Sequence, residues 1–406
     1  MLNFKKMKMI KKISKILFIG LFAALTTSCS DQLDIPSEAS LDANANLATE
    51  DVDKLLTGLY KKMRHPNQYG YFAIMNTEIM GDNYKPVKFQ WFQVQNFYEN
   101  KVPAGDILLS YFYADYYAGI DRANTILKVP SANEAQKGAA RYNRALSYLR
   151  LYDMFERVPL VDESYDRTPI APSSKEDVLN FIIEDLKYAK ENCVSFNGLS
   201  LLESQKTPTR EAASALLARV YRVQGNIAAA GVEAEELITS GKFSLSANPL
   251  ERDPEVIFMY KGNKAETVGS WGWIMSPEAR TWNCFAAADD LTALVKGEDT
   301  RKILFDFDGK EANGGYIYSK KYKTEDNSDL LVSRIAEMYL ISAEAGNTAR
   351  LDELQAARKS SLTLAEERRL EMSFEWTRWQ DLKLEGKTSY ILPYPTRAVD
   401  SNPLLK

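Results

Sequence analysis

The sequence predicts a mostly α-helical fold: a tetratricopeptide-like helical-repeat core with a loop-rich, partly β insertion. Apolar residues recur at helical spacing over most of 49–245 and again over 332–390. Residues 209–244 read as a pair of amphipathic helices of about the tetratricopeptide length, which is roughly 34 residues. Between the two helical parts, residues 246–331 combine glycines and tryptophans with short apolar runs, which predict loops and strands.

The first 28 residues have the organisation of a lipoprotein signal peptide. Six lysines and no acidic residue occupy 1–15, an apolar run covers 16–25, and small residues precede Cys29. The apolar run is shorter than the roughly 20 residues that span a bilayer. We therefore expect cleavage before Cys29 and attachment of several acyl chains to it, which anchors a protein stably. An ordinary secretory signal followed by a chance cysteine is the alternative.

Residues 29–48 are polar and predict a tether between the lipid and a domain over 49–406. The domain begins with a helix from Thr49, whose apolar stripe runs from Val52 to Met63. Further helices are expected over 107–129, 134–155 and 174–190. Ser174 followed by Asp177 predicts a capping box at the start of the last one.

In the helix pair over 209–244, Gly225-Asn226 separates the two helices and Gly241 ends the second. An Ala-x-x-Tyr pattern occurs on three separate predicted helices, which favours a helical-repeat core. The three pairs are Ala145/Tyr148, Ala218/Tyr221 and Ala336/Tyr339.

Strands are predicted over 255–260, 303–307 and 316–318, within the insertion. Helices return over 332–345, 349–359 and 364–383, and Thr363 with Glu366 predicts another capping box. The segment 391–406 is rich in proline and is expected to be extended.

The composition argues against several kinds of function. The chain carries a net charge of −4, and its first 28 residues hold six of the 51 basic residues and none of the 55 acidic ones. The rest is therefore acidic overall, which argues against nucleic acid as a partner. His65 is the only histidine, which excludes zinc sites that need two histidines. We expect no metal and no cofactor, while Cys193 and Cys284 are either one disulfide or two separate thiols.

Several segments, in this order along the chain, resemble the SusD/RagB family of surface lipoproteins. They include the start at Cys29–Asp34, an aromatic and Ala-Asn helix pattern, a D-x-R motif, a late helix with Ala-Glu-Ala, and a closing helix. The segments are Cys29–Asp34, Tyr116–Asn124, Arg144–Arg150 with Pro159–Val161, Thr209–Gly225, Asp299–Arg301, Arg334–Leu340 with Ala343–Ala345, Glu367-Arg368, Arg378–Leu382 and Gly386-Lys387.

The resemblance implies a lipid-anchored protein of the outer membrane that faces the cell exterior. Members of this family capture nutrients for SusC-like TonB-dependent transporters, so the resemblance implies such a transporter and an oligosaccharide as partners. Two alternatives remain open. One is a RagB-like protein that captures peptides, and the other is a tetratricopeptide-like envelope scaffold that binds no sugar.

Two stretches combine aromatic rings with polar side chains, the mixture that binds the apolar faces and hydroxyls of sugars. They are 69–98 and 260–282, and the resemblance places ligand sites on loops of these regions. Exposed tryptophans would favour sugar binding, whereas a scaffold would bury them. The candidate ligand residues are Asp82, Asn83, Tyr84, Trp91, Trp271, Trp273, Arg280 and Trp282.

The sequence gives little support to an enzyme. Gly269-Ser270 lacks the full spacing of a nucleophile elbow, and no glycine-rich phosphate loop is present. Asp289-Asp290 is a conceivable carboxylate pair for glycoside hydrolysis, but adjacent residues of a helix point apart. We therefore interpret these acids as solvated residues at a helix start, where the helix dipole favours negative charge.

Overall fold

The computed structural model describes residues 48–65, 77–89, 92–196, 208–261, 285–322 and 329–405. All of them fall within one compact unit, Asn46–Lys406. The predicted signal peptide, the lipid tether up to residue 47 and the lipidation site Cys29 lie outside the described residues. Within those residues, no helix combines the length and the apolar character that crossing a membrane requires.

Helices dominate the described residues, as the sequence predicted. They are α2 (Thr49–Met63), α3 (Phe92–Tyr98), α4 (Ile107–Lys128), α5 (Glu134–Phe155), α6 (Lys175–Asn192), α8 (Arg210–Gln224), α9 (Ile227–Thr239), α11 (Asp289–Thr292), α12 (Ile335–Glu344), α13 (Thr348–Arg358), α14 (Leu364–Glu371), α15 (Arg378–Leu384) and α16 (Thr396–Ser401). Two short 3₁₀ helices are η2 (Asp253–Glu255) and η3 (Thr300–Leu304).

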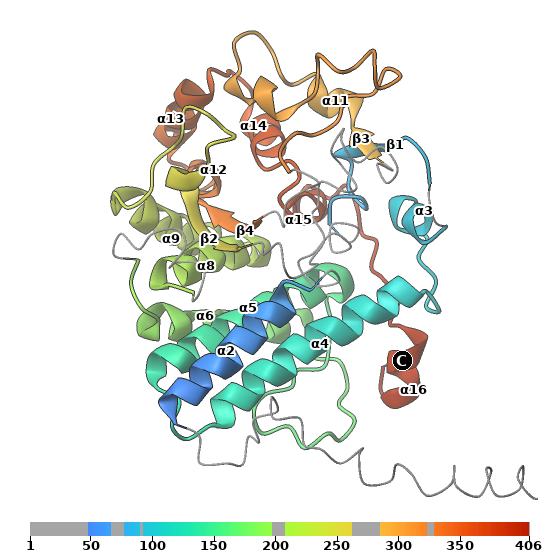
Figure 1. Cartoon of the computed structure of the whole chain (residues 1–406), viewed down its shortest axis with the longest axis vertical. Helices are drawn as coiled ribbons and strands as arrows, with labels where there is room; N and C mark the ends of the chain where they lie inside the picture. Colours follow the sequence, from blue (N-terminus) through green and yellow to red (C-terminus); the bar gives the residue numbers. More distant parts are fainter. Residues whose placement is uncertain are drawn as a thin grey trace, which may run out of the picture. The chain divides into compact units, whose positions relative to one another are not determined.

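Successive helices pack against one another along the chain. Helix α4 contacts α5, α5 contacts α6, α6 contacts α8, α8 contacts α9, α9 contacts α12, and α12 contacts α13 (Figure 1). This nearest-neighbour order is typical of helical repeats. The small residues Ala145, Ala218 and Ala336 are fully buried, which lets neighbouring helices approach closely.

The helix ends show why most predicted boundaries were right. Gly225 ends α8 in a left-handed conformation (φ 86°), which costs glycine little. Thr363 and Glu366 form the predicted capping box. Ser174 caps α6 by accepting the Asp177 backbone N–H at 3.0 Å. The predicted capping box forms only in part, because the Asp177 carboxylate accepts from the Ser174 hydroxyl at 2.6 Å rather than from the Ser174 backbone N–H.

Two small antiparallel sheets interrupt the helices. One pairs β2 (Val256–Tyr260) with β4 (Leu330–Arg334), is buried throughout, and lies beside α8 and α12. The other pairs β1 (Tyr84–Pro86) with β3 (Phe285–Ala287), with Tyr84 opposite Ala287. Figure 1 shows this second sheet on the same side of the molecule as α3 and α11. It therefore joins residues that lie 200 positions apart.

Several predicted elements were wrong. The segment 391–406, predicted to be extended, contains the helix α16. Residues 332–334 belong to strand β4 rather than to a helix, because their backbone pairs with β2 and α12 begins only at Ile335. A short apolar run does not distinguish a buried strand from a buried helix. Residues 303–307 are not a strand, since η3 ends at Leu304 and Phe305 forms only an isolated bridge with Ser319. Residues 316–318 form no strand either.

The predicted helix over 364–383 is two helices, α14 and α15, separated by a bend. Phe374 and Trp376 adopt left-handed backbone conformations (φ 67° and 75°), which are unfavourable for residues other than glycine. The buried Glu78 carboxylate holds the bend by accepting from the backbone N–H of Phe374 at 3.1 Å and of Arg378 at 3.5 Å. Periodicity alone gives no sign of this long-range contact.

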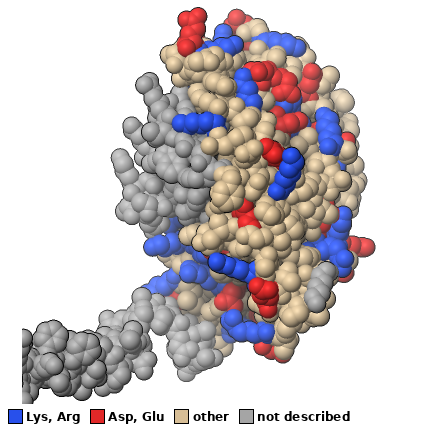
Figure 2. Space-filling model, turned by 90° about the vertical axis from the view of Figure 1, so that its right-hand side faces the viewer, with Lys and Arg blue, Asp and Glu red and all other residues tan. Residues whose placement is uncertain are grey.

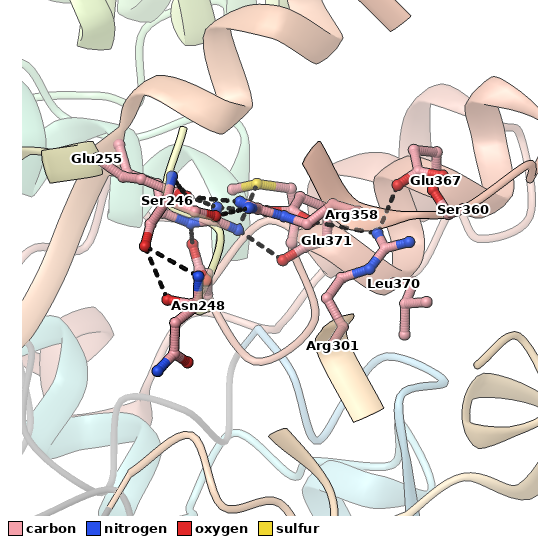
Figure 3. A network of polar contacts seen from close by, with 12 residues as sticks. Ser246, Asn248, Glu255, Arg301, Arg358, Ser360, Glu367, Leu370 and Glu371 are labelled. Atoms are coloured by element: carbon pink, nitrogen blue, oxygen red, sulfur yellow. Dashed lines mark hydrogen bonds and ion pairs between the residues drawn. The ribbon is translucent and has the colours of Figure 1, made fainter. Parts of the chain in front are cut away.

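A network of buried charges joins the two sheet strands to the C-terminal helices (Figure 3). Its hub is Glu371, at the end of α14. The Glu371 carboxylate lies 2.5 Å from Arg334, 2.8 Å from Arg358 and 3.2 Å from Arg301. Burial acts to raise the pKa of Glu371, but Arg358, Arg334 and Arg301 hold it well below its ordinary value.

Further buried carboxylates complete the network. Glu255 joins Arg334 and Arg358 at 2.9 and 2.7 Å, while Arg301 binds Asp299 at 2.8 Å and Glu367 at 2.6 Å. The D-x-R motif and part of the late-helix motif are therefore built into the core. Their place in the structure explains these motifs without any contact to a ligand.

Replacing Glu371 by glutamine should lower the free energy of unfolding by about 3–5 kcal/mol, because it removes a buried negative charge that three buried arginines share. Denaturant unfolding of the purified protein measures this change. The matched control is Glu184→Gln, whose side chain is 70% exposed and pairs with Lys187. It should change stability by less than about 1 kcal/mol.

The same variant should show a defined pH dependence. The folded-state pKa of Glu371 lies below the ordinary 4.5, so its stabilisation is complete above pH 4.5 and is lost as the pH falls through the folded-state value. The deficit of Glu371→Gln should be smaller at pH 3 than at pH 7. An equal deficit at both pH values would contradict this role for Glu371.

Candidate functional site

A surface pocket of about 580 Å³ opens where three segments meet. Its lining comes from 80–82 and 84–85, from Tyr98 and Asn100, and from 288–290. The first and the last of these segments are held together by the pairing of β1 with β3. A hydrogen bond from the Ala288 N–H to the Asn83 carbonyl (2.9 Å) adds to it. The pocket therefore depends on a long-range contact between the first aromatic stretch and the residues that follow the second.

The three described candidates from the first stretch lie at this pocket, with different surroundings. Asp82 lines it with its side chain 43% exposed. Asn83 is buried, with its amide donating to Glu78 at 3.1 Å and accepting from Arg369 at 3.2 Å. Tyr84 is also buried, with its ring 4.7 Å from that of Phe374. Asn83 and Tyr84 thus support the wall from within.

Asp82 is held by two arginines from the C-terminal helices. Its carboxylate accepts from Arg378 at 2.7 Å and lies 3.6 Å from Arg369. Partial burial acts to raise the pKa of Asp82, but Arg378 and Arg369 together lower it below its ordinary value. Asp82 is therefore an ionised, paired group at neutral pH.

The remaining predicted ligand residues, Trp91, Trp271, Trp273, Arg280 and Trp282, lie outside the described residues. Cys284 does so too, whereas Cys193 is a buried free cysteine next to Gly138. Burial raises the pKa of the Cys193 thiol to about 12.

An aromatic cluster forms one side of the pocket. Tyr98 lines it, and its ring centroid lies 5.9 Å from that of Phe89 and 5.8 Å from that of Phe285. Phe89 is 37% exposed. Tyr98 belongs to the aromatic stretch singled out from the sequence, but that stretch did not distinguish it from its neighbours.

The two acids of α11 also line the pocket. The side chains of Asp289 and Asp290 are 77% and 67% exposed, which confirms solvated acids at a helix start. Lys85 on β1 pairs with Asp289 at 2.5 Å, and its ammonium group lies 5.2 Å from the ring centroid of Tyr316. These exposed carboxylates retain acceptor capacity towards solvent.

Arg369 on α14 connects the segments around the pocket. Its guanidinium binds Asp290 at 2.8 Å, the Asp82 carbonyl at 2.8 Å and the Asn83 side chain at 3.2 Å. Sequence reasoning missed this residue, because the acids that it binds are distant along the chain. The planar guanidinium with its five donors suits this three-way contact.

Taken together, the pocket offers an aromatic ring, exposed carboxylates and a lysine in one open depression. This combination binds polyhydroxylated molecules by ring stacking and by hydrogen bonds to hydroxyl groups. Among the described residues, no group of His, Cys, Asp and Glu side chains is arranged to hold a metal ion.

Comparison with known proteins finds a matching family model, and relatives that align over most of the chain. The SusD-like family model, described as "Starch-binding associating with outer membrane", matches residues 31–222. A SusD-like protein of Bacteroides ovatus is 24% identical, over 91% of this chain and 82% of its own.

Solved structures share the fold. A laminarin-binding SusD-like protein superposes with a TM-score of 0.73 at 21% identity, covering 87% of this chain and 98% of its own. Surface glycan-binding protein A from Bacteroides thetaiotaomicron, in complex with laminarihexaose, gives 0.71 at 15% identity, covering 89% and 99%.

Replacing Arg369 by methionine should loosen the pocket, because it removes the bonds that join α11 to residues 82–83. Hydrogen exchange followed by mass spectrometry should show faster exchange in peptides covering 82–86 and 285–292. The control is Arg167→Met, since Arg167 forms one exposed pair with Asp121. Unchanged exchange around the pocket would show that Arg369 does not hold it.

Proposed function

The chain belongs to the SusD/RagB family, and on that basis we propose that it captures an oligosaccharide at the cell surface and delivers it to a SusC-like TonB-dependent transporter. The pocket beside Tyr98 carries this proposal, because its aromatic ring suits the apolar face of a sugar and its exposed carboxylates suit the hydroxyl groups. The glycan-binding names of the structurally similar proteins support the same class of ligand.

The pocket would hold the sugar by two kinds of contact, ring stacking and hydrogen bonds. The ring of Tyr98, backed by Phe89 and Phe285, would stack on the apolar C–H face of a sugar ring. The carboxylates of Asp289 and Asp290 would accept hydrogen bonds from hydroxyls on its edge. We propose that Trp271, Trp273 and Trp282, with Trp91 and Arg280, also bind the oligosaccharide.

The anchor and the location follow from the N-terminal sequence. Acylated Cys29 would attach the protein to the outer membrane facing the cell exterior, and residues 29–48 would tether the SusD-like domain over 49–406. No catalytic residue and no cofactor are part of the proposal. The pocket binds and releases its ligand unchanged.

The stacked helices offer a surface for the transporter. Helical repeats present broad faces to protein partners, and here the stack from α4 to α13 is distinct from the segments that form the pocket. We propose that the transporter binds this stack, so that sugar capture and partner binding use different parts of the domain.

Truncating Tyr98 to alanine should weaken oligosaccharide binding about tenfold, corresponding to about 1.4 kcal/mol, because the stacking surface is lost. Isothermal titration calorimetry with a panel of neutral oligosaccharides that includes laminarihexaose measures this. Tyr111→Ala is the control, since Tyr111 is 42% exposed on α4, away from the pocket. Binding of peptides in place of every sugar would support the RagB-like alternative.

Affinity purification of the lipidated protein from its native outer membrane should recover a TonB-dependent barrel in stoichiometric amount. Cys29→Ser should abolish membrane attachment and with it the recovery of the barrel, while sugar binding by the purified domain stays unchanged. Recovery of other envelope proteins without a barrel, together with no sugar binding, would favour the scaffold alternative.

A further inference from the structure

Charged groups around the pocket form a continuous chain of ion pairs. Cations and carboxylates alternate along it, from the loop after α15 through α14 to α11. The pairs are Lys387–Glu385 at 2.7 Å, Glu385–Arg378 at 3.3 Å, Arg378–Asp82 at 2.7 Å, Asp82–Arg369 at 3.6 Å and Arg369–Asp290 at 2.8 Å.

A second, separate pair completes the rim. Lys85 binds Asp289 at 2.5 Å and lies over the ring of Tyr316. Each carboxylate that lines the described part of the pocket therefore has a cation beside it. Lys85, the cation among those lining residues, is likewise already paired.

The wider surface agrees with this balance. Figure 2 shows basic and acidic side chains interspersed over the visible described surface, without an extended region of either sign. Electrostatic attraction of a charged ligand requires a region of one sign. The visible described surface therefore offers little to attract a polyanion.

A charged sugar would meet a specific cost at this rim. A uronate or sulfate group entering the pocket would lie beside Asp289 and Asp290, and like charges repel. To gain a partner, it would have to displace a carboxylate from Lys85 or Arg369. A hydroxyl group has no such cost, because it can donate to the exposed carboxylate oxygens while the ion pairs stay intact.

We propose that the internal ion pairs of this rim make the pocket selective for uncharged oligosaccharides and exclude those carrying uronate or sulfate groups. Asp289 and Asp290 are the residues that determine this specificity. The inference rests on the proposed sugar-binding function and adds the class of sugar.

Changing both acids to asparagine, in the variant Asp289→Asn with Asp290→Asn, tests the proposal. Asparagine keeps the size of the side chains but removes the carboxylate that pairs with Lys85 and one of the two that pair with Arg369. The wild-type protein should not bind oligogalacturonate, and the variant should gain at least tenfold in affinity for it. The gain should fall as salt is raised, because exposed charge pairs are screened.

Two controls locate the effect. Asp121→Asn releases Arg167 in an exposed ion pair outside the pocket, and it should bring no gain. Adding Lys85→Gln to the double variant should reverse much of the gain, since it removes one released cation. Circular dichroism of each variant reports whether it is folded.

The outcomes separate this inference from the proposed function. Oligogalacturonate binding by the wild-type protein that Lys85→Gln weakens would overturn the inference, as would a folded double variant that gains no binding. Failure of the wild-type protein to bind any neutral sugar would count against the proposed function instead. The gain measured in the double variant would still decide whether the ion pairs exclude anions.

Discussion

The pairing of Glu371 with three arginines is the constraint on which the C-terminal half of the fold depends. Arg301 is the arginine of the D-x-R motif, Arg334 ends β4, and Arg358 ends α13. A buried charge without its partner costs several kcal/mol of stability, so the three elements that carry these arginines must all pack around Glu371. Among them, Arg334 explains why the backbone before α12 is a strand, because its guanidinium also binds Glu255 beside β2. A helical start at residue 332 would give up both this pairing and the sheet.

The same hub also positions the pocket. Arg369 and Glu371 lie two residues apart on α14, and residues at that spacing point to different sides of a helix. One side of α14 therefore enters the charge network, while another carries Arg369 to Asp290 and to residues 82–83. Glu78 reinforces this arrangement, because it binds both the bend after α14 and Asn83. The pocket is thus lined by short segments that are far apart in the sequence. The buried network fixes the position of α14, which binds two of these segments through Arg369.

Sequence reasoning succeeded where the information was local. The bounds of α5 and the caps of α8 and α14 follow from periodicity and from residues such as Gly225 and Thr363. It failed where the structure depends on a distant residue. No pattern in the sequence near Phe374 predicts its hydrogen bond to Glu78, 296 positions away. The site shows the same division. Its general region could be predicted from aromatic content, whereas the role of Arg369 depends on Asn83, 286 positions earlier.

The buried charge network around Glu371 is separate from the charged residues at the rim of the pocket. This separation would allow the rim to change without a change in the fold. Charges such as Arg301, Arg334 and Glu371 are buried, so any change in them is felt throughout the core. Asp289 and Asp290 are instead exposed, and each pairs with a cation outside that network, Lys85 and Arg369 respectively. An exposed ion pair such as Lys85–Asp289 contributes little to stability, so the charge of Asp289 is nearly independent of the free energy of folding. Several of the motifs that carry the family resemblance therefore belong to the network, whereas the residues that we propose to bind the ligand lie outside those motifs.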